Sequence, residues 1–233
     1  MNVIRYASVG STLDLMHQMA AAGAAHGTTI VAEEQSAGRG ARGNLWHSPP
    51  GGLWLSRLIR PRNALGVEVL SLRVGLALAR GLEGIAGLPP VQLKWPNDVL
   101  LEGKKVAGIL CEARWQGQVP GWVAIGLGVN VCNVLPAEVM NVAARLADAA
   151  PGITPDDVLT PLLSTLDAME LDQQALTPEE LLEFGRRDWL RGRALRAPLE
   201  GTALGLAPDG ALHVRLADGV VSAARSGHVV LAS

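Results

Sequence analysis

The sequence is divided by its pattern of short apolar runs, which alternate between strand-like and helix-like character through the first 150 residues. Strand-like runs are rich in β-branched residues, whereas helix-like runs repeat their apolar residues every three or four positions. The longest continuous apolar runs, at residues 74–79 and 106–111, are far shorter than the roughly 18 residues that a membrane-spanning helix needs. The alternation therefore predicts a globular main domain of the α+β or α/β type.

The local patterns give the expected elements. Strands are expected at residues 3–9, 28–33, 53–60, 91–94, 99–101, 105–115 and 122–131. Helices are expected at residues 13–24, 66–85, 137–149, 155–175 and 178–190. Ser11, Thr154 and Thr177 precede three of these helices, and their side-chain oxygens are suited to accept hydrogen bonds from the first helical turn.

The character of the chain changes after Arg191. Short segments are separated there by the turn sequences PDG at residues 208–210, DG at 218–219 and SG at 226–227. Such turns predict hairpin-linked strands of a small barrel. We therefore place a domain boundary near residue 186, which divides the chain into residues 1–186 and 187–233.

Composition excludes several classes of protein. With 48% hydrophobic and 18% charged residues, the chain is not of the disordered class. A net charge of -2 argues against general nucleic-acid binding, which needs a surplus of positive charge. Cys111 and Cys132 both lie in apolar runs and are expected to be buried, inert thiols of a reducing compartment. Because the first residues lack the pattern of a secretory signal, we expect a cytoplasmic protein.

A loop rich in glycine and arginine follows the second expected strand. Its hexapeptide GRGARG, at residues 38–43, fits the G-x-G-x-x-G pattern of dinucleotide-binding proteins. That interpretation is disfavoured because the prolines and glycines at residues 49–52 oppose the helix that must follow. Arg39 and Arg42 beside backbone amides that glycine leaves uncovered instead indicate a site for an anion, with Trp46 close behind.

A second polar segment, KWPND at residues 94–98, separates two apolar strand segments. Pro96 has no backbone N–H, so the segment is expected to be a bend or a strand end. Asp98 is suited to hold a divalent metal, and Lys105 begins the next strand, so the two side chains can meet at one edge of a sheet. Asn130 ends another apolar run, whose glycines at 126 and 128 would let a ligand approach the backbone.

Together these segments resemble the biotin protein ligases. The matching pieces occur in the family order and comprise Ser11-Thr12, residues 35–43 with Trp46, residues 94–98, residues 105–110 and residues 126–130. The resemblance implies an α+β catalytic domain like that of class II aminoacyl-tRNA synthetases, with a mixed sheet and flanking helices, followed by an SH3-like barrel. Because Ser11 lies so near the start, we expect the monofunctional type without a DNA-binding domain.

The resemblance also implies the chemistry and the roles of individual residues. Biotin and ATP give biotinyl-5′-AMP, and a lysine of a biotin carboxyl carrier domain of acetyl-CoA carboxylase or a related carboxylase then takes up biotin. Lys105 and Arg39 are expected to be catalytic, and Asp98 to bind Mg²⁺. The expected biotin-binding residues are Ser11, Thr12, Gln35, Arg39, Gly40, Lys105 and Gly108. The expected ATP-binding residues are Arg42, Trp46, Lys94, Asn97 and Asn130. Ala41 departs from the family, which often has a basic residue there to order the loop over the intermediate.

Three other functions remain open at this stage. A lipoate protein ligase would share the fold and the adenylation chemistry. A non-enzymatic interaction module would rest on residues 187–233 alone, and a regulatory DNA-binding role is opposed by the net charge. No membrane association is expected, and edge strands of the sheet together with the habit of the family suggest a homodimer.

Overall fold

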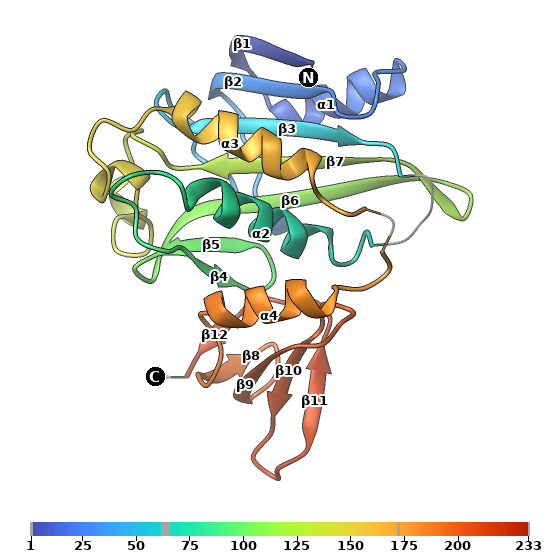
Figure 1. The fold of residues 1–233 in the computed structure, drawn as a ribbon, viewed down its shortest axis with the longest axis vertical. Coiled ribbons are helices and arrows are strands. Elements are labelled where there is room, and N and C mark those ends of the chain that lie inside the picture. The colour runs from blue at the N-terminus through green and yellow to red at the C-terminus, as the bar shows by residue number, and fades with distance from the viewer. Residues whose placement is uncertain (1, 62–65, 172, 233) are drawn as a thin grey trace.

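The fold is built on two β-sheets (Figure 1). The computed structural model describes residues 2–61, 66–171 and 173–232. Within them, a mixed sheet of seven strands forms the larger part of the molecule, and an antiparallel sheet of five strands forms the C-terminal part. The α+β character expected from the alternating apolar runs is confirmed.

The larger sheet has the strand order β1-β2-β3-β7-β6-β5-β4. Its strands are β1 (Val3–Val9), β2 (Thr29–Gln35), β3 (Leu53–Ile59), β4 (Gln92–Lys94), β5 (Asp98–Leu101), β6 (Lys104–Gln116) and β7 (Val119–Val129). The pair β1–β2 is parallel and the other neighbours are antiparallel. All the strands expected in this part of the chain are therefore present, with ends shifted by up to three residues.

Four α-helices lie among the described residues: α1 (Thr12–Ala21), α2 (Leu70–Leu82), α3 (Pro155–Asp167) and α4 (Pro178–Arg187). Ser11 caps α1 as expected, and its hydroxyl accepts from the backbone N–H of Asp14. Thr154 and Thr177 form capping boxes with carboxylates of the first turns. Helix α3 ends at Asp167, well before the expected end at residue 175, and residue 172 of that prediction lies outside the described residues.

The prediction of a helix at residues 137–149 is wrong. The structure has only two short 3₁₀ turns there, Ala137–Val139 and Leu146–Asp148. After a short turn closed on the Val139 carbonyl, the backbone hydrogen-bonds to the sheet: the N–H of Lys105 donates to the Val142 carbonyl, and the N–H of Ala144 donates to the Lys105 carbonyl. Tertiary pairing with a strand end thus overrides the local helical pattern.

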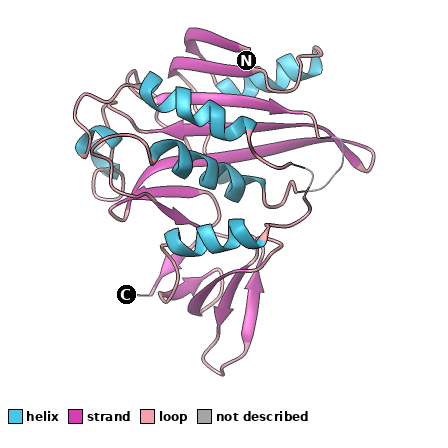
Figure 2. Ribbon diagram, viewed as in Figure 1, coloured by secondary structure: helices cyan, strands magenta, loops and turns pink. Residues whose placement is uncertain are grey.

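The two faces of the large sheet are covered differently. Helices α2 and α3 lie over one face (Figure 2), where they enclose the main apolar core. On the opposite face, α1 packs Leu13, Met16 and Ala20 against the sheet residues Ile30, Leu58 and Ala124. Burying each large side chain of this kind contributes about 1.5–3 kcal/mol. The sheet positions that continue this face along β6 and β7 carry glycines, and a cavity lies there.

The second sheet has the order β11-β10-β9-β8-β12. Its strands are β8 (Ala194–Ala197), β9 (Gly201–Leu206), β10 (Leu212–Arg215), β11 (Val221–Ala224) and β12 (Val230–Leu231). The turns expected at residues 208–210 and 218–219 connect neighbouring strands, as predicted. In the described part of the chain the outer strands β11 and β12 do not pair with each other, so this sheet is open.

The environments of the two cysteines differ from each other. Cys111 lies in β6, and burial raises the pKa of its thiol to about 12, as expected for an inert group. Cys132 is exposed, so the expectation of a buried thiol is wrong for this residue. The apolar run continues past the end of β7 at Val129, but the chain leaves the sheet there. Among the described helices, none is both long and apolar enough to cross a lipid bilayer.

A buried arginine joins α2 to the segment that leads to the second sheet. The Arg73 side chain is 1% exposed and forms an ion pair with Glu180 of α4, with Nε 2.9 Å from Oε1. Its remaining N–H groups donate to the carbonyls of Gln173 and Ala175. Removing one partner of such a buried pair leaves an uncompensated charge.

We expect Arg73→Ala to lower the free energy of unfolding by about 3–5 kcal/mol, because Glu180 would lose its buried partner. Arg80→Ala is the matched control on the same helix, since the Arg80 side chain is 41% exposed in its pair with Glu183. That change is expected to cost about 0–1 kcal/mol. Chemical denaturation of both variants measures the difference, and equal costs would contradict this account of the junction.

Candidate functional site

A cavity of about 1090 Å³ lies where the β2–β3 loop, the glycine-bearing part of β6 and β7, the 94–98 segment and the second sheet come together. All the site residues predicted from the sequence line it: Ser11, Thr12, Gln35, Arg39, Gly40, Arg42, Trp46, Lys94, Asn97, Asp98, Lys105, Gly108 and Asn130. Segments separated by more than 100 positions in the sequence therefore surround one space.

The floor of the cavity is bare backbone. Gly108 of β6 pairs with Gly128 of β7, and the indole of Trp46 lies against both. A Cβ built on Gly128 would lie 2.4 Å from Trp46 Nε1, and one on Gly108 would lie 2.9 Å from the indole ring. The Trp46 Nε1 atom is buried and has no hydrogen-bond partner among the described residues. Buried donors without a partner are rare in native proteins, and they commonly mark places where a ligand or an ordered water completes the hydrogen bonding.

The β2–β3 loop forms a small hairpin that carries Trp46. The N–H of Trp46 donates to the Gly38 carbonyl, and the N–H of Gly40 donates to the Asn44 carbonyl. Gly38 has no room for a side chain, because a Cβ would lie 2.4 Å from the Trp46 carbonyl oxygen. Arg42 adopts a left-handed conformation at φ 60° in the tip. No helix begins in this loop beyond one 3₁₀ turn, as expected from the prolines and glycines that follow.

Hydroxyl and amide groups line the end of the cavity beside α1. The Gln35 Oε1 atom accepts from both the N–H and the hydroxyl of Thr12, at 2.8 and 3.0 Å. Ser56 donates to the Thr12 hydroxyl, and Gln35 Nε2 donates to the Ser48 hydroxyl. The two serines hold the predicted residues in place. Nothing in the spacing of Ser48 and Ser56 distinguished them in the sequence.

Positive charge is concentrated around Asp98. Lys105 Nζ lies 2.5 Å from Asp98 Oδ1, and Lys94 Nζ lies 4.0 Å from Oδ2. Burial lowers the pKa of Lys94, the nearby Lys105 adds to this, and Asp98 opposes it. Lys105 also lies over the Trp46 ring at 5.1 Å. Two ammonium groups share one carboxylate, so this region carries a surplus positive charge that suits an anion.

The two predicted asparagines have structural contacts as well as cavity positions. Asn97 Nδ2 donates to the Ile109 carbonyl at 2.7 Å, which fixes the bend to β6. Asn130 is buried, and its Oδ1 accepts from Asn133 Nδ2 at 3.3 Å. Asn133, which also lines the cavity, had not been predicted.

The two loop arginines bind partners that the sequence did not indicate. Arg39 pairs with Glu112 at 2.8 Å and with Asp14 at 3.1 Å, and the hydrogen bond to Glu112 is the main reason that the pKa of Arg39 is raised. Arg42 Nη2 lies 3.1 Å from His228 Nδ1 of the C-terminal part. Arg39 and Lys105 thus line the same cavity, as predicted, but their charged groups have different partners.

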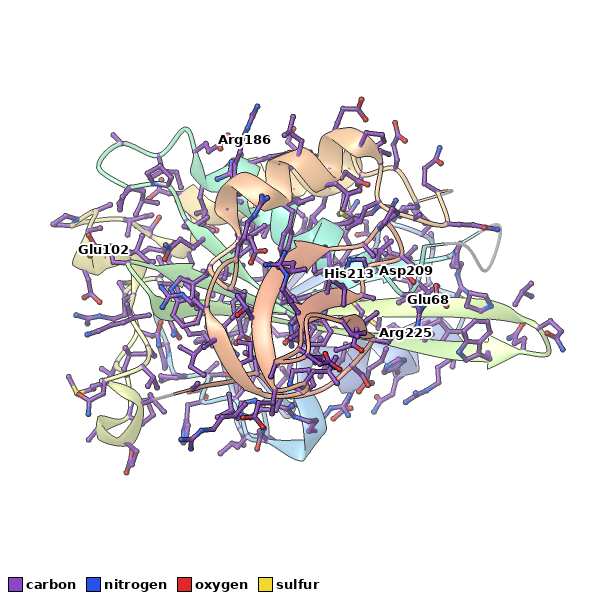
Figure 3. All side chains as sticks on the ribbon, turned by 90° about the horizontal axis from the view of Figure 1, so that it is seen from below. Glu68, Glu102, Arg186, Asp209, His213 and Arg225 are labelled. Carbon is purple, nitrogen blue, oxygen red and sulfur yellow. The ribbon has the colours of Figure 1, made fainter. Side chains whose placement is uncertain are left out.

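The second sheet also contributes to the cavity wall. Asp209, Arg225 and His228 line it together with Glu68 of the larger part. Viewed from below, Asp209 and Arg225 lie on the side of the second sheet that faces Glu68 (Figure 3), and Arg225 forms an ion pair with Asp209. These residues had not been predicted, because residues 187–233 offered only turn and strand patterns.

Comparison with known proteins gives consistent matches. The model of the biotin/lipoate A/B protein ligase family matches residues 7–130. The chain is 33% identical over 231 residues to the bifunctional ligase/repressor BirA of Bacillus subtilis, covering 94% of this chain and 71% of that protein. It is 33% identical over 216 residues to the biotin–[acetyl-CoA-carboxylase] ligase of Mycobacterium tuberculosis, covering 87% and 77%. The structure of the Aquifex aeolicus biotin protein ligase in complex with biotin and ATP superposes with a TM-score of 0.81 at 27% identity, covering 99% of this chain and 98% of that one.

We expect Gly128→Ala to move the Trp46 indole off the cavity floor, because the new methyl group would overlap Nε1. Subtracting the fluorescence of a Trp46→Phe background isolates the Trp46 signal. In Gly128→Ala that signal should shift to the red and become accessible to acrylamide. Gly84→Ala is the control, since a Cβ there meets nothing within 4 Å. An unchanged Trp46 signal in Gly128→Ala would show that the indole does not rest on this glycine.

Proposed function

The chain belongs to the biotin/lipoate A/B protein ligase family, and from this premise we propose that it attaches biotin to a lysine of a biotin carboxyl carrier domain, using ATP. The observation that carries the proposal is the match along 87% of the chain to a protein named biotin–[acetyl-CoA-carboxylase] ligase. The carrier is therefore proposed to belong to acetyl-CoA carboxylase or a related carboxylase. The cavity lined by the predicted site residues supports the proposal.

The reaction has two steps that need no protein nucleophile. A biotin carboxylate oxygen attacks the α-phosphorus of ATP, which gives biotinyl-5′-AMP and releases pyrophosphate. The amine of the carrier lysine then attacks the acyl carbon, forms the amide and releases AMP. A carboxyl group with an ordinary pKa near 4–5 is already ionised at neutral pH. The obstacle is the repulsion between two anions, so the protein acts by neutralising charge and fixing orientation.

Lys105 is the group best placed to neutralise that charge. Its ammonium forms an ion pair with Asp98, and Lys94 brings a second positive charge to the same carboxylate. Lys105 also lies over the Trp46 ring. In the proposed complex Lys105 bridges the biotin carboxylate and the α-phosphate. Such fixed charges are already in place when negative charge gathers in the transition state.

The other site residues take the roles expected from the sequence. The proposed biotin-binding residues are Ser11, Thr12, Gln35, Arg39, Gly40, Lys105 and Gly108. The proposed ATP-binding residues are Arg42, Trp46, Lys94, Asn97 and Asn130. The hydrogen bonds between Thr12 and Gln35 support the first set, because pre-oriented polar groups in an otherwise apolar pocket provide specificity.

The donors at this site also suit the proposed magnesium ion. Mg²⁺ is usually held by one or two protein carboxylates together with substrate phosphates and water. Asp98 lines the cavity and provides one carboxylate, and no group of three His, Cys, Asp or Glu side chains suited to a metal occurs among the described residues. This donor set fits an ion that arrives with ATP. When bound, the ion would reduce the negative charge of the phosphates.

Three further proposals concern the organisation of the protein. Residues 1–186 and 187–233 are proposed as two domains, the second of SH3-like type; the separate sheets and the change of pattern near residue 186 support this division. The edge strands β1 and β4 support a homodimer. The use of ATP and of a carboxylase supports a cytoplasmic location.

We expect the purified protein to catalyse ATP–pyrophosphate exchange with biotin and to increase the mass of a biotin carboxyl carrier domain by one biotinyl group. The family also includes lipoate ligases, so the same assay is run with lipoate and a lipoyl carrier domain. Because the positioned polar groups are proposed to select biotin, exchange with lipoate should be far slower. Exchange with lipoate alone would overturn the assignment of the substrate.

Lys105→Ala should slow the adenylation step by roughly 10²-fold or more, the usual effect of losing one electrostatic stabiliser. The neighbouring Lys104 is exposed and outside the cavity, so Lys104→Ala is the matched control and should keep wild-type exchange. Exchange rates measured at saturating biotin and ATP separate this effect from substrate affinity. A near-normal rate in Lys105→Ala would remove Lys105 from the mechanism.

A further inference from the structure

We infer that Glu112 and Asp14 are positioning residues, which bind Arg39 and so hold the β2–β3 hairpin over the cavity. We call these three residues the Arg39 clasp. The inference rests on the proposed function, because it concerns how the hairpin retains biotin. It gives Arg39 a different task from the catalytic one predicted from the sequence. The proposed catalytic charge then belongs to Lys105.

The clasp joins three separate elements. Arg39 Nη2 donates to Glu112 Oε2 of β6 at 2.8 Å, and Arg39 Nε lies 3.1 Å from Asp14 Oδ1 in the first turn of α1. The Glu112 side chain is 21% exposed, compared with 53% for Asp14, so Glu112 is the better shielded partner. Charge-assisted hydrogen bonds of this kind are stronger than neutral ones.

The Glu112 carboxylate has a second hydrogen-bond partner, His17, which helps to hold it in place. Trp122 Nε1 lies 3.0 Å from His17 Nδ1, and an indole N–H can only donate, so Nδ1 is the acceptor. The hydrogen of a neutral His17 ring is therefore on Nε2, which donates to Glu112 Oε2 at 2.9 Å. Burial opposes the charge on Glu112, but the hydrogen bonds from Arg39 and His17 outweigh it and lower the pKa of Glu112. The clasp consequently stays charged at neutral pH.

The charges argue against Arg39 as the neutralising group. The Arg39 guanidinium faces two carboxylates, and Arg114 lies 3.9 Å from Glu112 Oε2, so the cluster around Arg39 carries no surplus positive charge. The Lys105 side chain extends along β6 only as far as Gly108, where its Cε lies 3.2 Å from a built Cβ. Glu112 lies four residues further along that strand, about 13 Å at the usual rise per residue. The cationic group lines the cavity, whereas of the clasp only Arg39 does so, and its two carboxylate partners lie outside the lining.

The position of Arg39 in the hairpin explains what the clasp controls. Arg39 pairs with Leu45 across the hairpin, next to Trp46, which covers the Gly108–Gly128 floor. Holding the Arg39 side chain to α1 and β6 therefore fixes the strand that positions the indole. A released hairpin would open more often and let bound biotin leave, while Lys105 and Asp98 would keep their geometry. Loops that close over substrates commonly govern such exchange.

The test is Glu112→Gln, which keeps the shape of the side chain and removes its charge. We expect the KM and the Kd for biotin to rise by about 2- to 5-fold, the size of effect expected when one partly exposed ion pair is weakened, with kcat for exchange unchanged at saturating biotin. Biotin dissociation, followed by stopped-flow fluorescence, should accelerate by a similar factor. Arg114→Ala is the matched control, because Arg114 is 54% exposed and lies 3.9 Å from the same Glu112 oxygen; its biotin KM should match the wild type.

Arg39→Ala provides a second variant that does not threaten folding, since this residue lies in a surface hairpin. Because Arg39 acts through the clasp, Arg39→Ala should raise the biotin KM by the same factor as Glu112→Gln. The biotin KM of the double variant should be no higher than that of either single variant. A loss of kcat in Arg39→Ala with an unchanged biotin KM in Glu112→Gln would overturn the clasp and restore Arg39 as a catalytic charge. No biotin-dependent exchange in the wild type would instead overturn the proposed function, on which the inference rests.

Discussion

Two glycines that face each other across β6 and β7 set the geometry on which the site depends. Gly108 and Gly128 leave a part of the sheet without side chains, and the Trp46 indole and the Lys105 side chain both lie against it. A methyl group at Gly128 would already collide with the indole. The same sheet face carries apolar side chains beneath α1, so the cavity begins where the side chains become small. The fold creates a binding space by omitting side chains from a regular sheet.

The charges around this floor are divided between its two ends. Lys94, Asp98 and Lys105 form a group with surplus positive charge, whereas the charge of Arg39 is compensated by the carboxylates of its clasp. In the proposed reaction only the first group meets the carboxylate and phosphate anions, and the second holds the hairpin that covers them. The first group is the better shielded from water, which strengthens its interactions, because the Arg39 and Asp14 side chains of the second are 37% and 53% exposed. Because charge neutralisation and closure of the hairpin depend on different residues, a substitution can change one without changing the other.

The strands could be predicted well from the sequence, and the residues predicted for the site line one cavity, but their contacts could not be predicted. Residues such as Asp98 and Lys105 end or begin neighbouring strands, so antiparallel pairing of β5 with β6 brings them together. The partner of Arg39 is 73 positions away on β6, and no local pattern indicates which acid a flexible arginine will bind. The prediction of a helix at residues 137–149 failed for a related reason, because backbone hydrogen bonds to Lys105 interrupt the segment between its two short turns. Cys132 was misplaced because an apolar run does not show where a strand leaves its sheet.

In the proposed mechanism the Lys105 ammonium, held in place by Asp98, bridges the biotin carboxylate and the α-phosphate. A crystal structure with bound biotinyl-5′-AMP tests it most directly. The adenylate is expected in the cavity beside the Trp46 indole, with Lys105 Nζ hydrogen-bonded to an oxygen of the carboxyl-phosphate linkage. An adenylate bound in the same cavity with Lys105 still paired only to Asp98, or bound elsewhere on the molecule, would contradict it.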